Sequence, residues 1–434
     1  MVIFLTGATG LLGSRIAGAL VAQGHAVRCA ARHAPGGEGA VRGCRFVALD
    51  LSDELDPASV MPLLEGVDVV INAAGIFEDR TGHDFSRIHT RSPIALFQAA
   101  VMAGVGRIVQ ISALGADGGA QTPYHRSKKA ADDALRALPM SSLIVQPSLV
   151  FAEDGRSTQF FAAWSTLPVV PLPGSGAQVV QPVHVDDVVD LVTRGALTRA
   201  SAAPASETVA AVGPRPVTMK EYLRLLNRLC SAGAPLFMPV PMPLVKTAAA
   251  LCARLPGALM SPDALAMLER GNAASADGMQ RWLGRPPRSL GDEPSKRATL
   301  GLRAKLAWLA PLLAGAIGAV WIWTAIVSAW LYPRAASLDL LARVGAPEGT
   351  RLFLLYSAAL LDLLLGVLCF AWPARLGPRR RLWWAQIGLI VVYSVLITWR
   401  LPEFWLHPYG PLSKNLPMIA ALLLLVNIDG KGST

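Results

Sequence analysis

The fold is indicated by residues 2–20, which read VIFLTGATGLLGSRIAGAL. A short apolar run ends at Leu5, three glycines follow at Gly7, Gly10 and Gly13, and a helical pattern comes next. Gly7 permits a tight turn, Gly10 lets backbone approach a pyrophosphate, and Gly13 lets the helix pack closely on the strand. The free N–H groups at the helix start can then bind phosphate. We therefore predict a strand–turn–helix unit that binds a dinucleotide.

Strands and helices alternate through the rest of the first half. Apolar runs predict strands at 25–31, 45–49, 67–72, 107–111 and 143–146, and helical patterns occur at 93–103 and 127–138. This alternation predicts an α/β fold with a Rossmann-type, doubly wound parallel sheet, whose ligands bind at the carboxyl ends of the strands. The less regular residues from about 150 to 290 are expected to form a small substrate part of the same domain, residues 1–290.

The end of the second strand bears on the identity of the dinucleotide. An acidic residue usually holds the ribose of NAD(H) near this point. This chain offers Arg32 instead, with Arg28 nearby. A guanidinium can bind a 2′-phosphate through two hydrogen bonds, so we favour NADP(H) over NAD(H); the alternative is a solvated surface arginine. Asp50, after the third strand, would contact adenine in such a fold or cap the turn at Ser52.

A second group of residues can carry acid–base chemistry. Ser112 follows the fifth strand, and Tyr124 and Lys128 are four residues apart, on one face of a predicted helix. A nearby ammonium and a positive nicotinamide favour the ionised phenol and lower its pKa from about 10. Tyr124 would then exchange a proton with a carbonyl or alcohol while hydride moves at the cofactor, and Ser112 would hold the substrate oxygen. We therefore predict Ser112, Tyr124 and Lys128 as catalytic residues.

Together these motifs resemble an extended or atypical short-chain dehydrogenase/reductase over residues 1–300. The sequence is most similar to the group related to the nucleotide-binding accessory subunit of respiratory complex I. That similarity rests on ISALGAD at 111–117, YHRSKKAAD at 124–132 and LPVVPLPGSGAQVVQPVHVDD at 167–187. The C-terminal part resembles the DoxX-like four-helix membrane domains, through its span number, YGPLSKNLP at 409–417 and the fusion itself.

The resemblance implies a full set of cofactor contacts along the strand ends. They are Thr6, Gly7, Thr9, Gly10, Leu11, Leu12, Gly13, Arg32, Asp50, Leu51, Asn72, Ala73, Ala74, Gly75, Tyr124, Lys128, Pro147 and Val150. The chain departs from the family at Gln146, where Arg is frequent, and at Ala152, where Gly is frequent. It also departs around His89, where the family's usual Asn supports a proton relay through water. That last change leaves binding intact but bears on the efficiency of proton transfer.

Composition separates residues 301–434 from the rest. The chain is 53% hydrophobic and 16% charged, with a mean hydropathy of +0.42, which excludes a disordered chain and a heavily charged soluble enzyme. Nine of its 11 tryptophans lie in this segment, with 12 Lys and Arg against 5 Asp and Glu. The excess of basic residues explains the high isoelectric point without a nucleic-acid partner.

Four apolar runs follow residue 300. Those at 306–331, 352–372 and 382–399 are long enough to span a bilayer, and the fourth, at 416–428, is shorter. Tryptophans near the run ends match an aromatic belt, although a buried bundle in a soluble domain is the alternative. We predict an all-α transmembrane four-helix bundle at 305–430, joined to the first domain by a linker at 291–304.

Basic residues predict the orientation of these spans. Nine lie on the side that holds the N-terminal domain and the loop at 375–381, and five lie on the other side. This bias predicts a multi-pass protein of the inner (cytoplasmic) membrane with its N-terminal domain in the cytoplasm. Asp362, in the middle of the second span, is expected to face the bundle interior, either as a proton or ligand site or as a structural hydrogen bond between helices.

Three further patterns complete the predictions. The apolar segment 241–259 is expected to be a core helix of the substrate part, with a helix lying on the bilayer as the alternative. The five cysteines have no Cys-x-x-Cys spacing, and no metal-ligand cluster is present, so we predict no disulfide framework and no metal site. No basic n-region precedes the first apolar run, so no cleaved signal peptide is expected.

Three functions remain open on the sequence. The favoured one is a membrane-anchored NAD(P)H-dependent oxidoreductase that acts on a small, lipid-soluble carbonyl or quinone-like substrate. The second is a non-catalytic NADPH-binding accessory module with a membrane-complex partner, as in the complex I group. The third is a nucleotide-sugar epimerase or dehydratase, which would hold NAD tightly and consume none.

Overall fold

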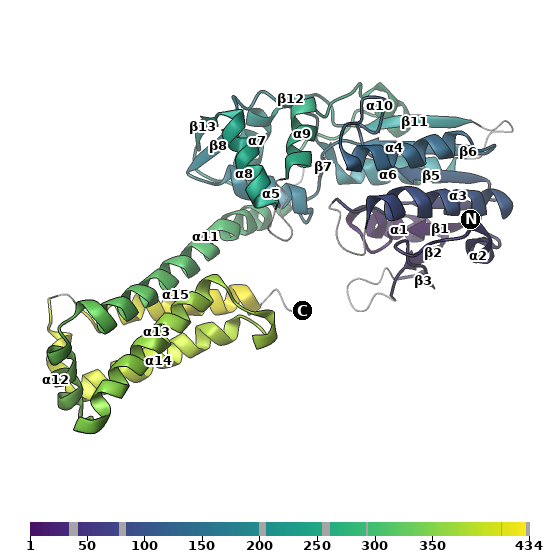
Figure 1. Cartoon of the computed structure of the whole chain (residues 1–434). Coiled ribbons are helices and arrows are strands. Elements are labelled where there is room, and N and C mark those ends of the chain that lie inside the picture. The colour runs from purple at the N-terminus through teal and green to yellow at the C-terminus, as the bar shows by residue number, and fades with distance from the viewer. Residues whose placement is uncertain are drawn as a thin grey trace. The chain divides into compact units, whose positions relative to one another are not determined.

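The structure is a computed structural model, and it describes residues 1–33, 42–77, 84–198, 205–253, 261–291, 294–408 and 410–430. The chain divides into two compact units, Met1–Ala304 and Lys305–Thr434. Figure 1 shows the α/β arrangement of the first unit and the helices of the second. The two units are described separately below.

A seven-stranded parallel sheet forms the centre of the N-terminal unit, in the order β11-β6-β5-β4-β1-β2-β3. Its strands are β1 (Val2–Thr6), β2 (Ala26–Ala31), β3 (Cys44–Ala48), β4 (Val69–Asn72), β5 (Arg107–Ile111), β6 (Ser141–Pro147) and β11 (Ser206–Ala211). The strand order reverses between β1 and β4, which creates the crevice where ligands bind in doubly wound sheets. The predicted fold class is confirmed, and the predicted strands lie within a few residues of the observed ones.

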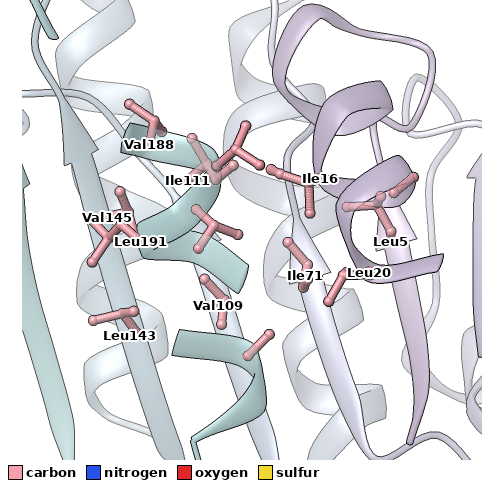
Figure 2. Packing of buried hydrophobic residues seen from close by; sticks show 14 of the residues in the cluster. Leu5, Ile16, Leu20, Ile71, Val109, Ile111, Leu143, Val145, Val188 and Leu191 are labelled. Atoms are coloured by element: carbon pink, nitrogen blue, oxygen red, sulfur yellow. The ribbon is translucent and has the colours of Figure 1, made fainter. Parts of the chain in front are cut away.

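Helices cover both faces of this sheet, because successive side chains of a buried strand point to opposite sides. Along β1, Leu5 packs with Ile16 and Leu20 of α1 (Leu11–Ala22) on one face, as Figure 2 shows. Phe4 packs on the other face with the cluster that includes Leu96. The first face also holds α6 (Val185–Leu197) and α10 (Asp277–Leu283), and the second holds α2 (Pro57–Val60), α3 (Ser92–Met102) and α4 (Pro123–Arg136).

The segment after β6 builds a smaller part around a separate hydrophobic cluster. Its strands are β7 (Val150–Phe151), β8 (Val169–Pro173), β9 (Val179–Val180), β10 (Val183–His184), β12 (Val217–Thr218) and β13 (Leu236–Val240). Its helices are α5 (Arg156–Ser165), α7 (Met219–Leu229), α8 (Met242–Cys252) and α9 (Pro262–Arg270). Helix α7 begins with a full capping box between Thr218 and Glu221.

The prediction of a core helix at 241–259 is wrong for its described part. Helix α8 buries only Val245 and Ala249, whereas the side chains of Leu244 and Leu251 are exposed. Apolar composition predicted burial, but a helix is buried only where other elements cover it. Residues 254–259 lie outside the described residues.

The predicted linker at 291–304 is helical from Pro294 onward. Helix α11 (Pro294–Ile326) begins there, and Leu300 and Ala304 are buried in the hydrophobic cluster of the small part. A Cβ atom at Gly301 would lie 2.6 Å from the carbonyl oxygen of Cys230, so the glycine permits this close approach. The segment therefore contributes to the core of the N-terminal unit.

The C-terminal unit is all helical. After α11 come a π-helical turn (Val327–Leu331), α12 (Arg334–Val344), α13 (Arg351–Phe370), α14 (Arg380–Arg400) and α15 (Asn415–Gly430). Among the described residues, three helices are long and apolar enough to cross a membrane, namely Thr299–Leu331, Glu348–Phe370 and Arg380–Arg400. The fourth predicted run forms a shorter apolar helix, and α12 is a helix that the sequence did not predict. Tyr409 and Lys431, which entered the predictions, lie outside the described residues.

Polar side chains lie inside this unit. The indole N–H of Trp321 donates to Oε1 of Gln386 at 3.0 Å, which satisfies two buried groups across two helices. Asp362 on α13 is also buried, but its Oδ1 has no hydrogen-bond partner among the described residues. The structural hydrogen bond considered for Asp362 is therefore not observed at that oxygen.

Candidate functional site

The glycine loop connects β1 to α1 at the strand reversal. Gly7 has a φ of +68°, and a Cβ atom there would lie 2.6 Å from the backbone of Ala73. A Cβ atom on Gly13 would lie 2.1 Å from the carbonyl oxygen of Gly7. Gly10 precedes α1 and supplies no side-chain cap, so the first N–H groups of the helix face the loop. This is the arrangement that binds a pyrophosphate, and the residues present fit such a cofactor.

A pocket opens beside this loop. The predicted contacts that line it are Thr6, Gly7, Thr9, Gly10, Arg32, Asp50, Leu51, Ala73, Ala74 and Gly75. Residues not predicted also line it, namely Ala30, Ala31, Leu49, Ser52, Ile76 and Ile88. Most of these adjoin predicted contacts at the ends of β2, β3 and β4, so the strand boundaries could have identified them. Ile88 comes from a different segment, for which the sequence carries no such signal.

The two arginines near β2 have different surroundings. Arg32 lines the pocket, whereas the guanidinium of Arg28 donates to the carbonyl oxygen of Leu63 at 3.0 Å. Asp50 lines the pocket and also caps its own turn, because its Oδ1 accepts from the backbone N–H of Ser52 at 2.9 Å. The two roles considered for Asp50 are therefore compatible.

Several other predicted contacts do not line this pocket. Asn72 is fully buried: its Oδ1 accepts from the hydroxyl of Thr6 at 2.5 Å, and its Nδ2 donates to Gln110 at 2.7 Å. Asn72 thus ties the ends of β1, β4 and β5 together and supports the pocket from behind. Leu11, Leu12 and Gly13 lie in α1, Pro147 ends β6, and Val150 begins β7.

Tyr124 lies in the first turn of α4, inside an aromatic enclosure. The ring centroids of Phe77, Phe85 and His89 lie 5.5, 5.9 and 5.4 Å from that of Tyr124. No hydrogen bond is found for its hydroxyl among the described residues. Burial raises the pKa of Tyr124 to about 12, contrary to the lowered pKa predicted from Lys128. Desolvation is the cause of this shift, and at this pKa the phenol is protonated and can donate a proton at neutral pH.

Lys128 lies one turn further along α4 and connects two strand ends. Its Nζ donates to the carbonyl oxygens of Ala74, at 3.2 Å, and of Ile111, at 3.1 Å. Burial lowers the pKa of Lys128 to about 8, and the charge of Asp132 opposes that shift. Ala74 lines the cofactor pocket and Ile111 precedes Ser112, so Lys128 joins the pocket to the predicted catalytic serine.

Ser112 is held by a residue that the sequence did not predict. Its hydroxyl donates to Oδ2 of Asp132 at 2.5 Å, and Nε2 of Gln146 donates to the same oxygen at 3.3 Å. Asp132 is fully buried, and its Oδ1 has no partner among the described residues. In this arrangement the Ser112 oxygen can only accept a hydrogen bond from a substrate. A serine that held a carbonyl oxygen, as predicted for Ser112, would have to donate one. The spacing of Lys128 and Asp132, four residues apart on α4, is the signal that could have revealed this network.

His89 lies in a π-helical turn, Ser86–Arg91, and is buried. Its Nε2 accepts from the backbone N–H of Ile76 at 2.9 Å, so its Nδ1 carries the proton and donates to the hydroxyl of Ser127 at 3.0 Å. Burial, and then the charge of Lys128, lowers the pKa of His89 to about 2. Both ring nitrogens are therefore engaged, and the neutral ring fixes the end of β4 against α4.

Arg270 holds the loop that follows Ser112. Its guanidinium donates to the carbonyl oxygen of Gly115 at 2.8 Å and to both carboxylate oxygens of Asp117, at 2.6 and 2.7 Å. This ion pair lowers the pKa of Asp117. Arg270 is the last residue of α9, so this contact attaches the small part to the loop that follows β5, beside the candidate site. No group of three or more potential metal ligands is found among the described residues.

A parallel doubly wound sheet with this loop and this pocket defines an NAD(P)-binding Rossmann domain. The sequence comparisons agree. The family described as NAD(P)H-binding matches residues 7–169, and the DoxX-like family matches residues 318–423. The chain is therefore an NAD(P)-binding Rossmann domain fused to a DoxX-like domain.

Two curated relatives each match a little under half of this chain. The chain is 31% identical to ceramide reductase of Caulobacter vibrioides, over 43% of this chain and 58% of that protein. It is 29% identical to NADH dehydrogenase (ubiquinone) 1 alpha subcomplex subunit 9, mitochondrial, of Mus musculus, over 44% of this chain and 50% of that protein. The matches thus span about half the length of these relatives. The predicted similarity to the complex I group is confirmed.

Solved structures share the fold. A nucleoside-diphosphate-sugar epimerase from Staphylococcus aureus is 17% identical, with a TM-score of 0.55 over 69% of this chain and 100% of that one. The dTDP-glucose 4,6-dehydratase DesIV from Streptomyces venezuelae, with NAD and TYD bound, is 22% identical, with a TM-score of 0.51 over 72% and 100%. At these identities the likeness establishes the fold of the N-terminal unit and nothing about its substrate.

Proposed function

We propose that this chain is a membrane-anchored, NADPH-dependent reductase of a lipid-soluble carbonyl or quinone-like substrate. One observation carries the proposal: the Tyr124 hydroxyl, protonated and without a hydrogen-bond partner among the described residues, lies in an aromatic enclosure one helical turn from Lys128. A phenol with a pKa of about 12 suits proton donation to a carbonyl oxygen better than proton removal from an alcohol. The enclosure by Phe77 and Phe85 favours an apolar substrate.

The chain's own residues have separate roles in this reaction. The cofactor, held by the glycine loop and Arg32, supplies hydride when bound. Tyr124 donates its Oη proton to the substrate oxygen, and the Lys128 ammonium stabilises the phenolate that forms. Ser112 donates its proton to Asp132, so it can accept only from a donor group elsewhere on the substrate and does not hold the reacting carbonyl oxygen. Phe85, which is buried, shields one side of the Tyr124 ring from water.

Relatives and location support a lipid substrate. The similarity to a ceramide reductase, 31% identity over 193 residues, favours a lipid substrate. The DoxX-like domain and the apolar helices support a tether in the cytoplasmic membrane, with the N-terminal unit on the cytoplasmic side by its basic loops. A site tethered beside a bilayer encounters substrates that dissolve in lipid.

Turnover tests the proposal. Purified full-length chain in lipid nanodiscs should oxidise NADPH with a long-chain ketone or a quinone, and Tyr124→Phe should abolish this activity while NADPH still binds. Tyr222→Phe, which removes a different buried phenol, serves as the matched control. Arg32→Ser should weaken NADPH binding and leave NADH binding unchanged. Unchanged turnover in Tyr124→Phe contradicts the assignment.

A binding module is the second candidate, and His89 favours it. Because both ring nitrogens are engaged, His89 does not relay a proton from Tyr124. The similarity to the complex I subunit points the same way, towards a partner in a membrane complex. Under this alternative NADPH co-purifies with the chain and no membrane extract oxidises it. Tightly bound NAD without net consumption supports the third candidate, an epimerase or dehydratase.

A further inference from the structure

Helix α8 exposes an apolar face although it belongs to the N-terminal unit. Its residues, MPLVKTAAALC, include one charged side chain, Lys246. Val245 and Ala249, one turn apart, pack against α9. Leu244 and Leu251, two turns apart on another face, are 62% and 57% exposed. An exposed apolar face of this kind marks a contact with a partner or a membrane.

The strand that precedes α8 also exposes apolar side chains. In β13, Leu236 and Met238 are 66% and 49% exposed, and they alternate with Phe237, which packs into the cluster beneath. β13 pairs with β8 in a two-stranded parallel sheet. Two consecutive elements, β13 and α8, therefore present apolar side chains outward. We call Leu236, Met238, Leu244 and Leu251 the apolar surface.

Basic side chains outnumber acidic ones near the apolar surface, although Lys246 of α8 pairs with Glu269 of α9 at 3.1 Å. Residues 214–253 contain five basic residues and one acidic residue, Glu221. The carboxylate of Glu221 is engaged in capping α7. Arg215, Arg224 and Arg228 line one cavity beside Phe237, and the guanidinium of Arg224 lies 5.3 Å from the centre of its ring. This charge complements an anionic lipid surface.

The chain also leaves the N-terminal unit at the same hydrophobic cluster. Phe237 packs against that cluster, and Ala304, the last residue of the unit, is buried in it. The next residue, Lys305, begins the unit that carries the apolar helices. If the C-terminal unit anchors the chain in a membrane, the bilayer is the partner available to the apolar surface.

We propose that β13 and α8 lie on the bilayer surface, with the apolar surface inserted among anionic lipids and Arg224 and Arg228 binding their phosphates. This proposal rests on the proposed membrane anchoring. An interfacial helix with an apolar face and basic neighbours binds membranes in this way. The substrate part would then meet lipid directly.

Fluorescence quenching in vesicles tests this proposal on the full chain. A polarity-sensitive dye is placed at Leu244→Cys, in a background where Cys44 and Cys252 are serine, and at Met102→Cys as the matched exposed control. In vesicles of phosphatidylethanolamine and phosphatidylglycerol, the Leu244 dye should shift to the blue, lose iodide quenching and gain quenching by spin-labelled acyl chains. The Met102 dye should stay accessible to iodide. Arg224→Glu with Arg228→Glu should restore iodide quenching at Leu244.

Each other outcome has a distinct meaning. Equal iodide quenching at Leu244 and Met102 in an inserted chain overturns the proposal and leaves the membrane anchoring intact. Protection at Leu244 that follows the protein-to-lipid ratio, and is the same in phosphatidylcholine, overturns it in favour of a second copy of the chain. A chain that alkaline carbonate washes from the vesicles overturns the anchoring itself. NADPH binding measured on each variant identifies any that fails to fold.

Discussion

The charge of Lys128 limits the proposed reduction at high pH. Its pKa is lowered to about 8 by burial, so it is an ammonium below that pH and neutral above it. Only the charged form stabilises a phenolate on Tyr124. We expect the rate of NADPH-dependent reduction to fall as pH rises through about 8. Initial rates at saturating NADPH, measured from about pH 6 to pH 10, check this expectation; a flat profile contradicts it.

Asp132 should set where that decline occurs. Its carboxylate raises the pKa of Lys128 and accepts a hydrogen bond from the Ser112 hydroxyl. Asp132→Asn removes the charge, so we expect the alkaline decline to begin at lower pH and the rate at neutral pH to drop. Asp133→Asn is the matched control, because Asp133 is adjacent in sequence but pairs on the surface with Lys129 and Arg136. Equal profiles for the two variants would exclude the positioning role of Asp132.

His89 should make the fold sensitive to acid. Its pKa is lowered to about 2 in the folded chain, whereas an unfolded histidine titrates near 6.5. The unfolded state therefore binds a proton first, and stability falls as pH drops below about 6.5, by about 1.4 kcal/mol per pH unit. Thermal unfolding of full-length chain in detergent measures this loss. His89→Asn should reduce the acid dependence, and the exposed His33→Asn should not; an unchanged slope in His89→Asn rules the idea out.

At the scale of elements, alanine substitutions at two glycines of α1 should have different effects. A Cβ atom on Gly13 would lie 2.1 Å from backbone, whereas one on Gly18, in the same helix, would meet nothing within 4 Å. Gly13→Ala should displace α1 from the loop and abolish NADPH binding. Gly18→Ala should retain binding and add about 0.5–1 kcal/mol of stability. NADPH fluorescence titration with thermal unfolding separates the two; retained affinity in Gly13→Ala contradicts the close-packing argument.

Elements were predictable from the sequence where their residue pattern lies within one short segment. The glycine loop, the alternation of strands and helices and three long apolar runs each lie within one segment, and each matches the structure. The exposure of α8 was not predictable, because burial depends on which elements cover a helix. The spacing of Lys128 and Asp132 places these two residues on one face of α4, but the bond between Asp132 and Ser112 spans 20 residues, so that spacing does not identify the partner of Asp132. The raised pKa of Tyr124 likewise depends on how far the aromatic side chains enclose it.

At the scale of the whole chain, the tether should matter only for substrates dissolved in lipid. The N-terminal unit has its own hydrophobic clusters and the complete cofactor pocket, and α11 enters it only as far as Ala304. A chain ending at Ala304 should therefore bind NADPH as tightly as the full chain. It should also reduce a water-soluble ketone or quinone at the same rate.

The same truncation should slow reduction of a bilayer-dissolved substrate by at least about tenfold, because it abolishes the high effective concentration that a tether maintains. Phosphatidylcholine vesicles suit this measurement, since they offer no net charge to the basic residues near α8. The full chain reconstituted in those vesicles is compared with an equal amount of truncated chain added outside. Equal rates would mean that the C-terminal unit serves something other than access to substrate. Asp362, whose buried Oδ1 has no hydrogen-bond partner among the described residues, would then be the next residue of this unit to test.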